Sequence, residues 1–262
     1  MTGNVLTLLN ADALDDAVAA AVATVKARPQ DADARMLLAS LSVLQGDLKR
    51  AETHATMAAR LSPDDAVGLG LFRQHLRGLL ARAAWWDDGA VPSFPGGPSA
   101  TDQAVLALNI ALREGGDVPA ALDAVEEARG TVPGQWNGQQ VEDLRDLDDR
   151  LPHAVEALSS GGNYLWIDMA RIAGIEFRAV ESPLDLALRP ARVQLIDGAE
   201  ADLVLPALYP APQSDQHRLG RQTDFSDWNG ATIGHGQKAW LVGDDMQGLL
   251  SAETITFGDS HG

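Results

Sequence analysis

A repeat of 34 residues in the first half of the chain most constrains what this sequence can fold into. An offset of 34 carries residues 14–17 (LDDA) onto 48–51 (LKRA) and Pro29 onto Pro63. A third copy lies at an offset of 70, two periods plus two residues, and carries Pro63 onto Pro133. Repetition at a period of roughly 20–50 residues is typical of solenoids, in which each small unit stacks on the next. The first half is therefore expected to be a stack of such units.

The residues within the repeat indicate what each unit is. A period of 34, with small residues early in a second helix and a proline after it, is typical of tetratricopeptide hairpins. Ala51, Ala55 and Ala58 stand at helical spacing, which allows antiparallel helices to approach closely, and Gly46 suits a helix end. The usual large aromatic residues are missing, so the repeats are degenerate, and two alanine- and leucine-rich helices can also align by chance. We predict antiparallel helical hairpins over residues 1–133.

The second half of the chain has a different sequence pattern. Leucines and a valine at three- and four-residue spacings predict a helix over residues 144–158, and Pro152 indicates a break or a new start within it. Beyond it, short runs read as strands, and the pair Asp197 and Gly198 between two of them is a strong hairpin signal. We predict an α+β protein with two domains, a tetratricopeptide-like helical-repeat domain at 1–140 and a smaller strand-rich domain, an antiparallel sheet or partial barrel, at 141–262.

The two domains are expected to dock directly. A short repeat array without capping repeats leaves an apolar face on its last helix, and the strand-rich half follows without a long flexible linker. We therefore predict that Leu144, Leu147 and Leu151 are buried at the junction. Trp166 and Tyr209 are interpreted as core residues rather than as ligand contacts.

Charge and composition exclude several classes of function. The net charge is −17 and both halves are acidic, so neither offers the basic surface that nucleic acids or anionic lipids require. The chain has no cysteine, which excludes disulfides, thiol nucleophiles and CxxC zinc sites. The longest apolar stretch, residues 17–25, is too short to span a bilayer, and the N-terminus lacks the basic region of a signal peptide. We predict a cytoplasmic protein that inserts into no membrane.

No constellation in the sequence carries catalytic or metal-binding chemistry. The six histidines form no closely spaced pair, and Asp215 with His217 is a weak signal for a shared metal. Residues 159–162 (SSGG) precede a strand, unlike a nucleophile elbow, and residues 230–236 (GATIGHG) lack the lysine of a phosphate-binding loop. We predict a binding protein rather than an enzyme, without catalytic, cofactor or metal sites. The alternatives are an enzyme that binds a small molecule or nucleotide on the strand-rich domain, and a generic tetratricopeptide scaffold.

Several short motifs follow one another in the second half. They are RDLDDR at 145–150, a Gly-Gly pair at 161–162 that leads into Tyr164 and Trp166, LRPAR at 188–192, LPALYP at 205–210 and RLGRQTD at 218–224. In this order, across roughly residues 140–245, they resemble the ImpE/TagJ family of type VI secretion accessory proteins. Residues 258–262 offer nothing to align.

The resemblance implies a role rather than a reaction. Members of the family are cytoplasmic accessory proteins of the type VI machine, and some bind the N-terminal helix of the small contractile-sheath subunit. For this chain the resemblance implies the same partner, and a part in sheath assembly or in sheath recycling by an AAA+ ATPase. Stacked helical hairpins form grooves of the kind that accept a partner helix.

Four arginines stand out in the acidic second half as candidate partner-binding residues: Arg189, Arg192, Arg218 and Arg221. Guanidinium groups bind carboxylates bidentately, so these side chains could recognise an acidic flank of a partner helix. The alternative is that they form structural ion pairs within the protein.

Overall fold

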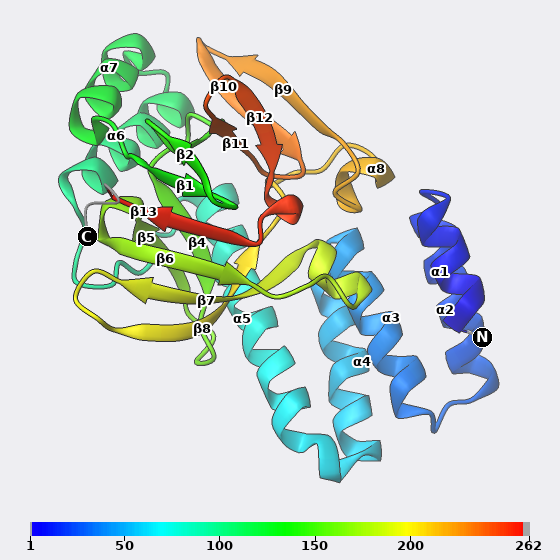
Figure 1. Ribbon diagram of the computed structural model, residues 1–262. Helices are drawn as coiled ribbons and strands as arrows, with labels where there is room; N and C mark the ends of the chain where they lie inside the picture. Colours follow the sequence, from blue (N-terminus) through cyan, green and yellow to red (C-terminus); the bar gives the residue numbers. More distant parts are fainter. Residues whose placement is uncertain (1, 259–262) are drawn as a thin grey trace.

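The structure is a computed structural model that describes residues 2–258. Helices make up the first half and strands most of the second, as Figure 1 shows, which confirms the predicted α+β class. The α-helices of this part of the chain are α1 (Thr2–Asn10), α2 (Leu14–Ala27), α3 (Ala32–Gln45), α4 (Leu48–Leu61), α5 (Ala66–Asp88), α6 (Ala100–Glu114), α7 (Val118–Arg129) and α8 (Asp215–Arg218).

Helices α1 to α4 form the predicted antiparallel hairpins, and the sequence explains where each helix begins and ends. Asp31 and Asp47 accept hydrogen bonds from the backbone N–H groups of Ala34 and Arg50, so they cap the starts of α3 and α4. Gly46 ends α3 with a φ of 80°, which is in the left-handed region that glycine tolerates. The two helices then pack face to face.

The alanines of the repeat lie where the helices cross. Ala17, Ala51, Ala55 and Ala58 have no exposed surface, while Ala121 in the third copy is half-buried. We expect Ala51→Leu to overpack the contact and to cost about 1–3 kcal/mol, or roughly 2–12 °C in Tm. Ala19→Leu, on the exposed face of α2, is the matched control. A Tm for Ala51→Leu equal to that of the control would show that the α3–α4 contact is not tight.

Strands form one large antiparallel sheet and two small ones. The eight-stranded sheet has the order β2-β1-β13-β6-β7-β8-β4-β5, and β10-β9 and β12-β11-β3 lie beside it. The predicted hairpin at Asp197 and Gly198 is confirmed, since it joins β7 to β8 with Gly198 at a φ of 85°. The strands are β1 (Gly134–Trp136), β2 (Gln139–Val141), β3 (Arg145–Asp146), β4 (Ala154–Leu158), β5 (Tyr164–Asp168), β6 (Ile172–Phe177), β7 (Leu188–Leu195), β8 (Glu200–Pro206), β9 (Thr223–Trp228), β10 (Ala231–Gly236), β11 (Ala239–Val242), β12 (Asp245–Gly248) and β13 (Thr254–Phe257).

The helix predicted over residues 144–158 is wrong. This segment contains β3 and β4, and all five residues of β4 are buried. A strand that is buried on both faces has no polar alternation, so its apolar residues are easily mistaken for a helical face. Leu151 is buried in the core that spans both halves, whereas Leu144 is buried within the strand-rich half rather than at the junction, and Leu147 is half-exposed.

One apolar core spans both halves of the protein, and a second lies within the strand-rich half. Helix α5 packs against β4 and β5, and the ring centroids of Trp85 and Trp166 lie 4.9 Å apart across this contact. Short segments of the strand-rich half also reach the first helices: the 3₁₀ turn Pro183–Leu186 contacts α3, and Asp215 on α8 accepts a hydrogen bond from the backbone N–H of Leu14. None of the helices within residues 2–258 is both long and apolar enough to cross a membrane.

Candidate partner-binding groove

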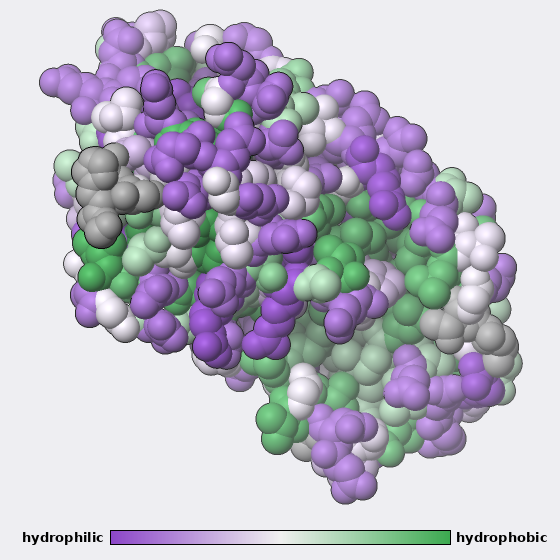
Figure 2. Space-filling view, viewed as in Figure 1, coloured by the Kyte–Doolittle hydropathy of each residue, from purple (hydrophilic) through white to green (hydrophobic). Residues whose placement is uncertain are grey.

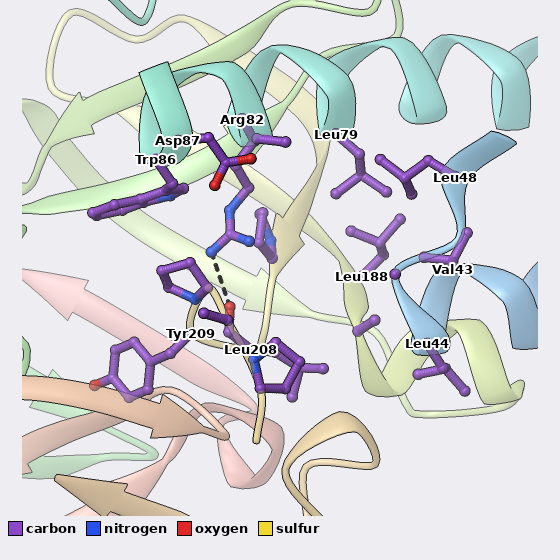
Figure 3. Close-up of a pocket in the computed structure, with 17 residues that line it drawn as sticks. Val43, Leu44, Leu48, Leu79, Arg82, Trp86, Asp87, Leu188, Leu208 and Tyr209 are labelled. Carbon is purple, nitrogen blue, oxygen red and sulfur yellow. Dashed lines mark hydrogen bonds between the residues drawn. The ribbon is translucent and has the colours of Figure 1, made fainter. Parts of the chain in front are cut away.

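A mainly apolar groove opens where the helical half meets the strand-rich half. Its cavity has a volume of about 230 Å³. In the space-filling view, apolar surface gathers in the hollow between the two halves (Figure 2). The close-up shows α5 on one side of the groove and the α3–α4 corner with β7 and the chain after β8 around it (Figure 3). The apolar side chains that line it include Val43, Leu44, Leu48, Leu79, Ala83, Leu188 and Leu208.

The wall on the strand side is a short proline-rich segment, residues 206–212. Leu208 forms an isolated bridge with Gln237, and the Tyr209 hydroxyl donates a hydrogen bond to Asp146 at 2.6 Å. Ala211 has a φ of 55°, so the segment turns sharply before α8. Backbone and side-chain contacts therefore hold this wall in place.

A buried cluster of charges lies behind the groove and joins the two halves. Arg82 on α5 binds Glu156 on β4 with two hydrogen bonds, of 2.8 Å from Nε and 2.9 Å from Nη2, and its Nη2 also donates to the carbonyl oxygen of Leu208. This last bond is the dashed line in Figure 3. Lys238 Nζ lies 3.1 Å from Glu156 and 3.0 Å from Asp146. We call Arg82, Glu156, Lys238 and Asp146 the interface charge cluster.

The electrostatics of the interface charge cluster follow from burial and mutual attraction. Burial by itself would raise the pKa of Glu156, but Arg82 and Lys238 outweigh it and hold that pKa far below the ordinary value. Burial raises the pKa of Asp146 despite the neighbouring Lys238. The pKa of Lys238 is raised because the attraction of Asp146 and Glu156 exceeds the effect of burial. Each of these groups is held by an oppositely charged neighbour.

The groove has no arrangement suited to catalysis among the residues that line it. Its ionisable side chains are Arg82, Asp87 and Tyr209. Arg82 is fixed by Glu156, and burial together with Asp146 raises the pKa of Tyr209 well above its ordinary value. A nucleophile with an adjacent general base is not among them. The arrangement is suited to holding apolar side chains.

The four candidate arginines occupy separate environments. Arg189 is buried and donates hydrogen bonds to the carbonyl oxygens of Arg178, Leu250 and Ala252, so its guanidinium ties β7 to neighbouring loops. Its three counterparts lie nearer the surface beside aspartates: Arg192 is 3.6 Å from Asp202, Arg218 is 3.1 Å from Asp215, and Arg221 is 3.8 Å from Asp12. Arg218 ends α8 and Arg221 lies three residues beyond it, whereas Arg189 and Arg192 lie on β7.

Trp166 and Tyr209 are buried core residues, as predicted. Sequence reasoning did not single out Arg82, Glu156 or Lys238. The available signal was a charged residue next to or inside an apolar run, Glu156 in AVEAL and Lys238 before AWLV, because a charge in a buried run requires a partner.

The chain is similar to known proteins along most of its length. A family model for the tetratricopeptide repeat matches residues 4–66, and the model described as ImpE protein matches residues 138–256. The chain is 28% identical over 258 residues to the type VI secretion system accessory component TagJ of Pseudomonas aeruginosa, which covers 95% of this chain and 89% of that protein. A crystal structure of protein VPA1032 from Vibrio parahaemolyticus shares the fold, with a TM-score of 0.90, 25% identity and 98% of both chains covered. These matches confirm the resemblance found in the sequence.

Proposed function

This chain belongs to the ImpE/TagJ family, and from that premise we propose that it is a non-enzymatic adaptor of a type VI secretion system. Its partner is the small subunit of the contractile sheath, which it meets in the cytoplasm. The observation that carries the proposal is the apolar groove between the helical and strand-rich halves, whose walls are fixed by the interface charge cluster. The match to tetratricopeptide repeats supports the role of an adaptor, and so does the similarity to a protein described as an accessory component.

The shape and chemistry of the groove favour a helix as the bound element. An amphipathic helix presents apolar side chains at positions i, i+3, i+4 and i+7 along one face. A cavity of about 230 Å³ holds a few aliphatic side chains rather than a whole helix. The N-terminal helix of the sheath subunit would therefore lie across the opening and insert its apolar side chains between Leu79 and Leu188.

Arginines add selectivity in this proposal. Arg218 and Arg221 on and after α8 follow closely on residues 206–212 of the groove wall. An acidic flank of the partner helix would compete there with Asp12 and Asp215 for the guanidinium groups. Arg192 is a further exposed contact, and Arg189 acts by holding β7, on which Leu188 lies.

Two adjacent leucines on α5 provide a matched test. Leu79 is half-buried and lines the groove, whereas Leu80 is 54% exposed and lines a separate hollow on the outer side of α4 and α5. We expect Leu79→Glu to weaken binding of a peptide with the sheath subunit's N-terminal helix by roughly 10–100-fold, because an apolar contact of about 1.5–3 kcal/mol is lost. Leu80→Glu should change the Kd by about twofold or less. Fluorescence anisotropy measures both, with circular dichroism to show that the variants fold.

The same titration at low and high salt tests how much the arginines contribute to the affinity. Raising the salt from about 0.1 to 1 M shortens the screening length from roughly 10 to 3 Å, which weakens only the contacts of the arginines. The expected loss of affinity is therefore under about tenfold. Absence of binding by the wild-type protein would contradict the proposed partner. Greater sensitivity of Leu80→Glu than of Leu79→Glu, or loss of nearly all affinity at high salt, would contradict the groove.

A further inference from the structure

Three side chains with metal-binding atoms meet in the interior where α6, β4 and β5 come together. Asp102 lies in the first turn of α6, His153 directly precedes β4, and Asp168 ends β5. One potential ligand atom from each lies within 4.8 Å of the other two. The three residues are 1%, 1% and 8% exposed, respectively. This trio lies outside the groove and outside the interface charge cluster.

The hydrogen bonds of the trio show which of its atoms face one another. His153 Nε2 lies 2.8 Å from Asp102 Oδ1, but His153 Nδ1 is buried without a hydrogen-bond partner in the part of the chain that the structure describes. Asp102 also accepts a bond from the backbone N–H of Ser99 through Oδ2, and Asp168 accepts one from Ala170 through Oδ1. Because Nε2 is the nitrogen that faces Asp102, an ion held by the three residues would bind His153 through Nε2.

The charges of the trio also favour a bound cation. Two carboxylates lie in this buried place, and within residues 2–258 neither forms an ion pair with a lysine or arginine. One imidazole can supply at most a single positive charge, and it does so only when it is protonated. Buried carboxylates need a compensating charge, because their desolvation costs several kcal/mol. A divalent cation would balance both.

Contrary to the expectation from the sequence that the protein has no metal site, we propose that Asp102, His153 and Asp168 form a binding site for a divalent transition-metal ion, with Zn²⁺ as the preferred ion. One imidazole nitrogen and two carboxylate oxygens are a ligand set that zinc accepts. Ligands at about 2.0–2.2 Å from zinc stand roughly 3–4 Å from each other, so small rotations of these side chains suffice. Mg²⁺ fits poorly, because it keeps several waters and gives them up reluctantly. A water or a second carboxylate oxygen would complete the tetrahedron.

Such a site would join the two halves of the protein. Asp102 belongs to the helical half, whereas His153 and Asp168 belong to two paired strands, with Ala154 opposite Asp168 in the register. An ion that binds all three stabilises the folded state alone, since the unfolded chain does not bring them together. The small exposed part of Asp168 offers the ion a way in.

Metal-free protein, prepared with EDTA, provides the test. We expect Zn²⁺ at a hundredfold excess over its Kd to raise the Tm by roughly 5–10 °C, with one zinc per chain by elemental analysis, and Mg²⁺ to have no effect. Co²⁺ in place of zinc should give the visible absorption of a four-coordinate ion. Asp168→Asn, which keeps the volume and the acceptor for Ala170 but removes the charge, should lose the shift in Tm.

A second variant controls for zinc that binds elsewhere in the protein. His217 and His235 stack with their ring centroids 6.4 Å apart, and Asp224 lies 2.8 Å from His217, so this cluster could also attract the ion. His235→Gln should keep the full shift in Tm. The proposal is overturned if no stoichiometric zinc binds, if the shift survives in Asp168→Asn, or if it disappears in His235→Gln. These outcomes do not depend on the sheath partner, because no peptide is present.

The stability of Asp168→Asn in the absence of zinc is a further test. Asp168→Asn removes one of two buried carboxylates, so without zinc it should be at least as stable as the wild type. An equal loss of stability with and without zinc would mean that Asp168 acts only through its local contacts, and would contradict the metal site.

Discussion

Replacing Glu156 by alanine is expected to cost about 3–5 kcal/mol of stability, or roughly 6–20 °C in Tm. Glu156 is 3% exposed and binds both Arg82 and Lys238. Without it, Arg82 would lose its ion pair, and Lys238 would be left with Asp146 alone. Because Arg82 is on α5 and Glu156 is on β4, the loss should loosen the contact between the two halves. Thermal unfolding followed by circular dichroism gives the measurement.

The pH dependence of the stability of a second variant, Glu156→Gln, distinguishes the loss of the charge from the loss of side-chain shape. The pKa of Glu156 lies far below its ordinary value of 4.5 in the folded protein. A depressed carboxyl pKa stabilises the protein above the unfolded pKa, and this contribution is lost as the pH falls towards the folded pKa. The stability deficit of Glu156→Gln should therefore be constant from pH 7 to about 5 and shrink at lower pH. A deficit that stays unchanged at pH 3 would show that charge is not its source.

Trp166→Ala is expected to have a comparably large effect, a loss of about 3–5 kcal/mol. Trp166 is 1% exposed and meets Trp85 and Phe94 edge to face, with ring centroids 4.9 and 5.9 Å away. Its Nε1 donates a hydrogen bond to the hydroxyl of Tyr164, which in turn donates to Glu156. The substitution would leave a cavity at the contact of α5 with β5. Urea denaturation measures the loss.

Two further tryptophan variants serve as controls for the loss of stability in Trp166→Ala. Trp166→Phe keeps most of the apolar volume and should lose less than the alanine variant. Trp228→Ala, at a position on β9 that is 40% exposed, should change stability by about 0.5 kcal/mol or less. A loss for Trp166→Ala that matches that of Trp228→Ala would exclude Trp166 as a core residue.

The features that the sequence predicts well are local or periodic. The helical hairpins follow from a repeat that is visible over neighbouring segments, and the β7–β8 turn follows from Asp197 and Gly198. The sequence predicts a helix where β4 lies, because burial on both faces removes the alternation that distinguishes a strand from a helix. Periodicity alone does not separate the two.

The features that the sequence does not predict depend on long-range contacts. Arg82 and Lys238 are far apart in the chain yet bind the same carboxylate. Asp102, His153 and Asp168 come from three segments, so no spacing such as HxxxH marks them. The reverse holds for Arg189 and Arg192, which are close in sequence but lie in different environments, one buried and one exposed. Such placement depends on the path of the whole chain.

The hydrogen bond between Leu14 and Asp215 can form only late in the protein's synthesis. Its two residues are 201 positions apart, so at about 5–20 residues per second a ribosome needs roughly 10–40 s to make the second after the first. The first helical hairpins can form early from local contacts, but the surface that α8 covers stays open throughout this interval. During translation, that end of the nascent chain is therefore available to chaperones or to other growing chains.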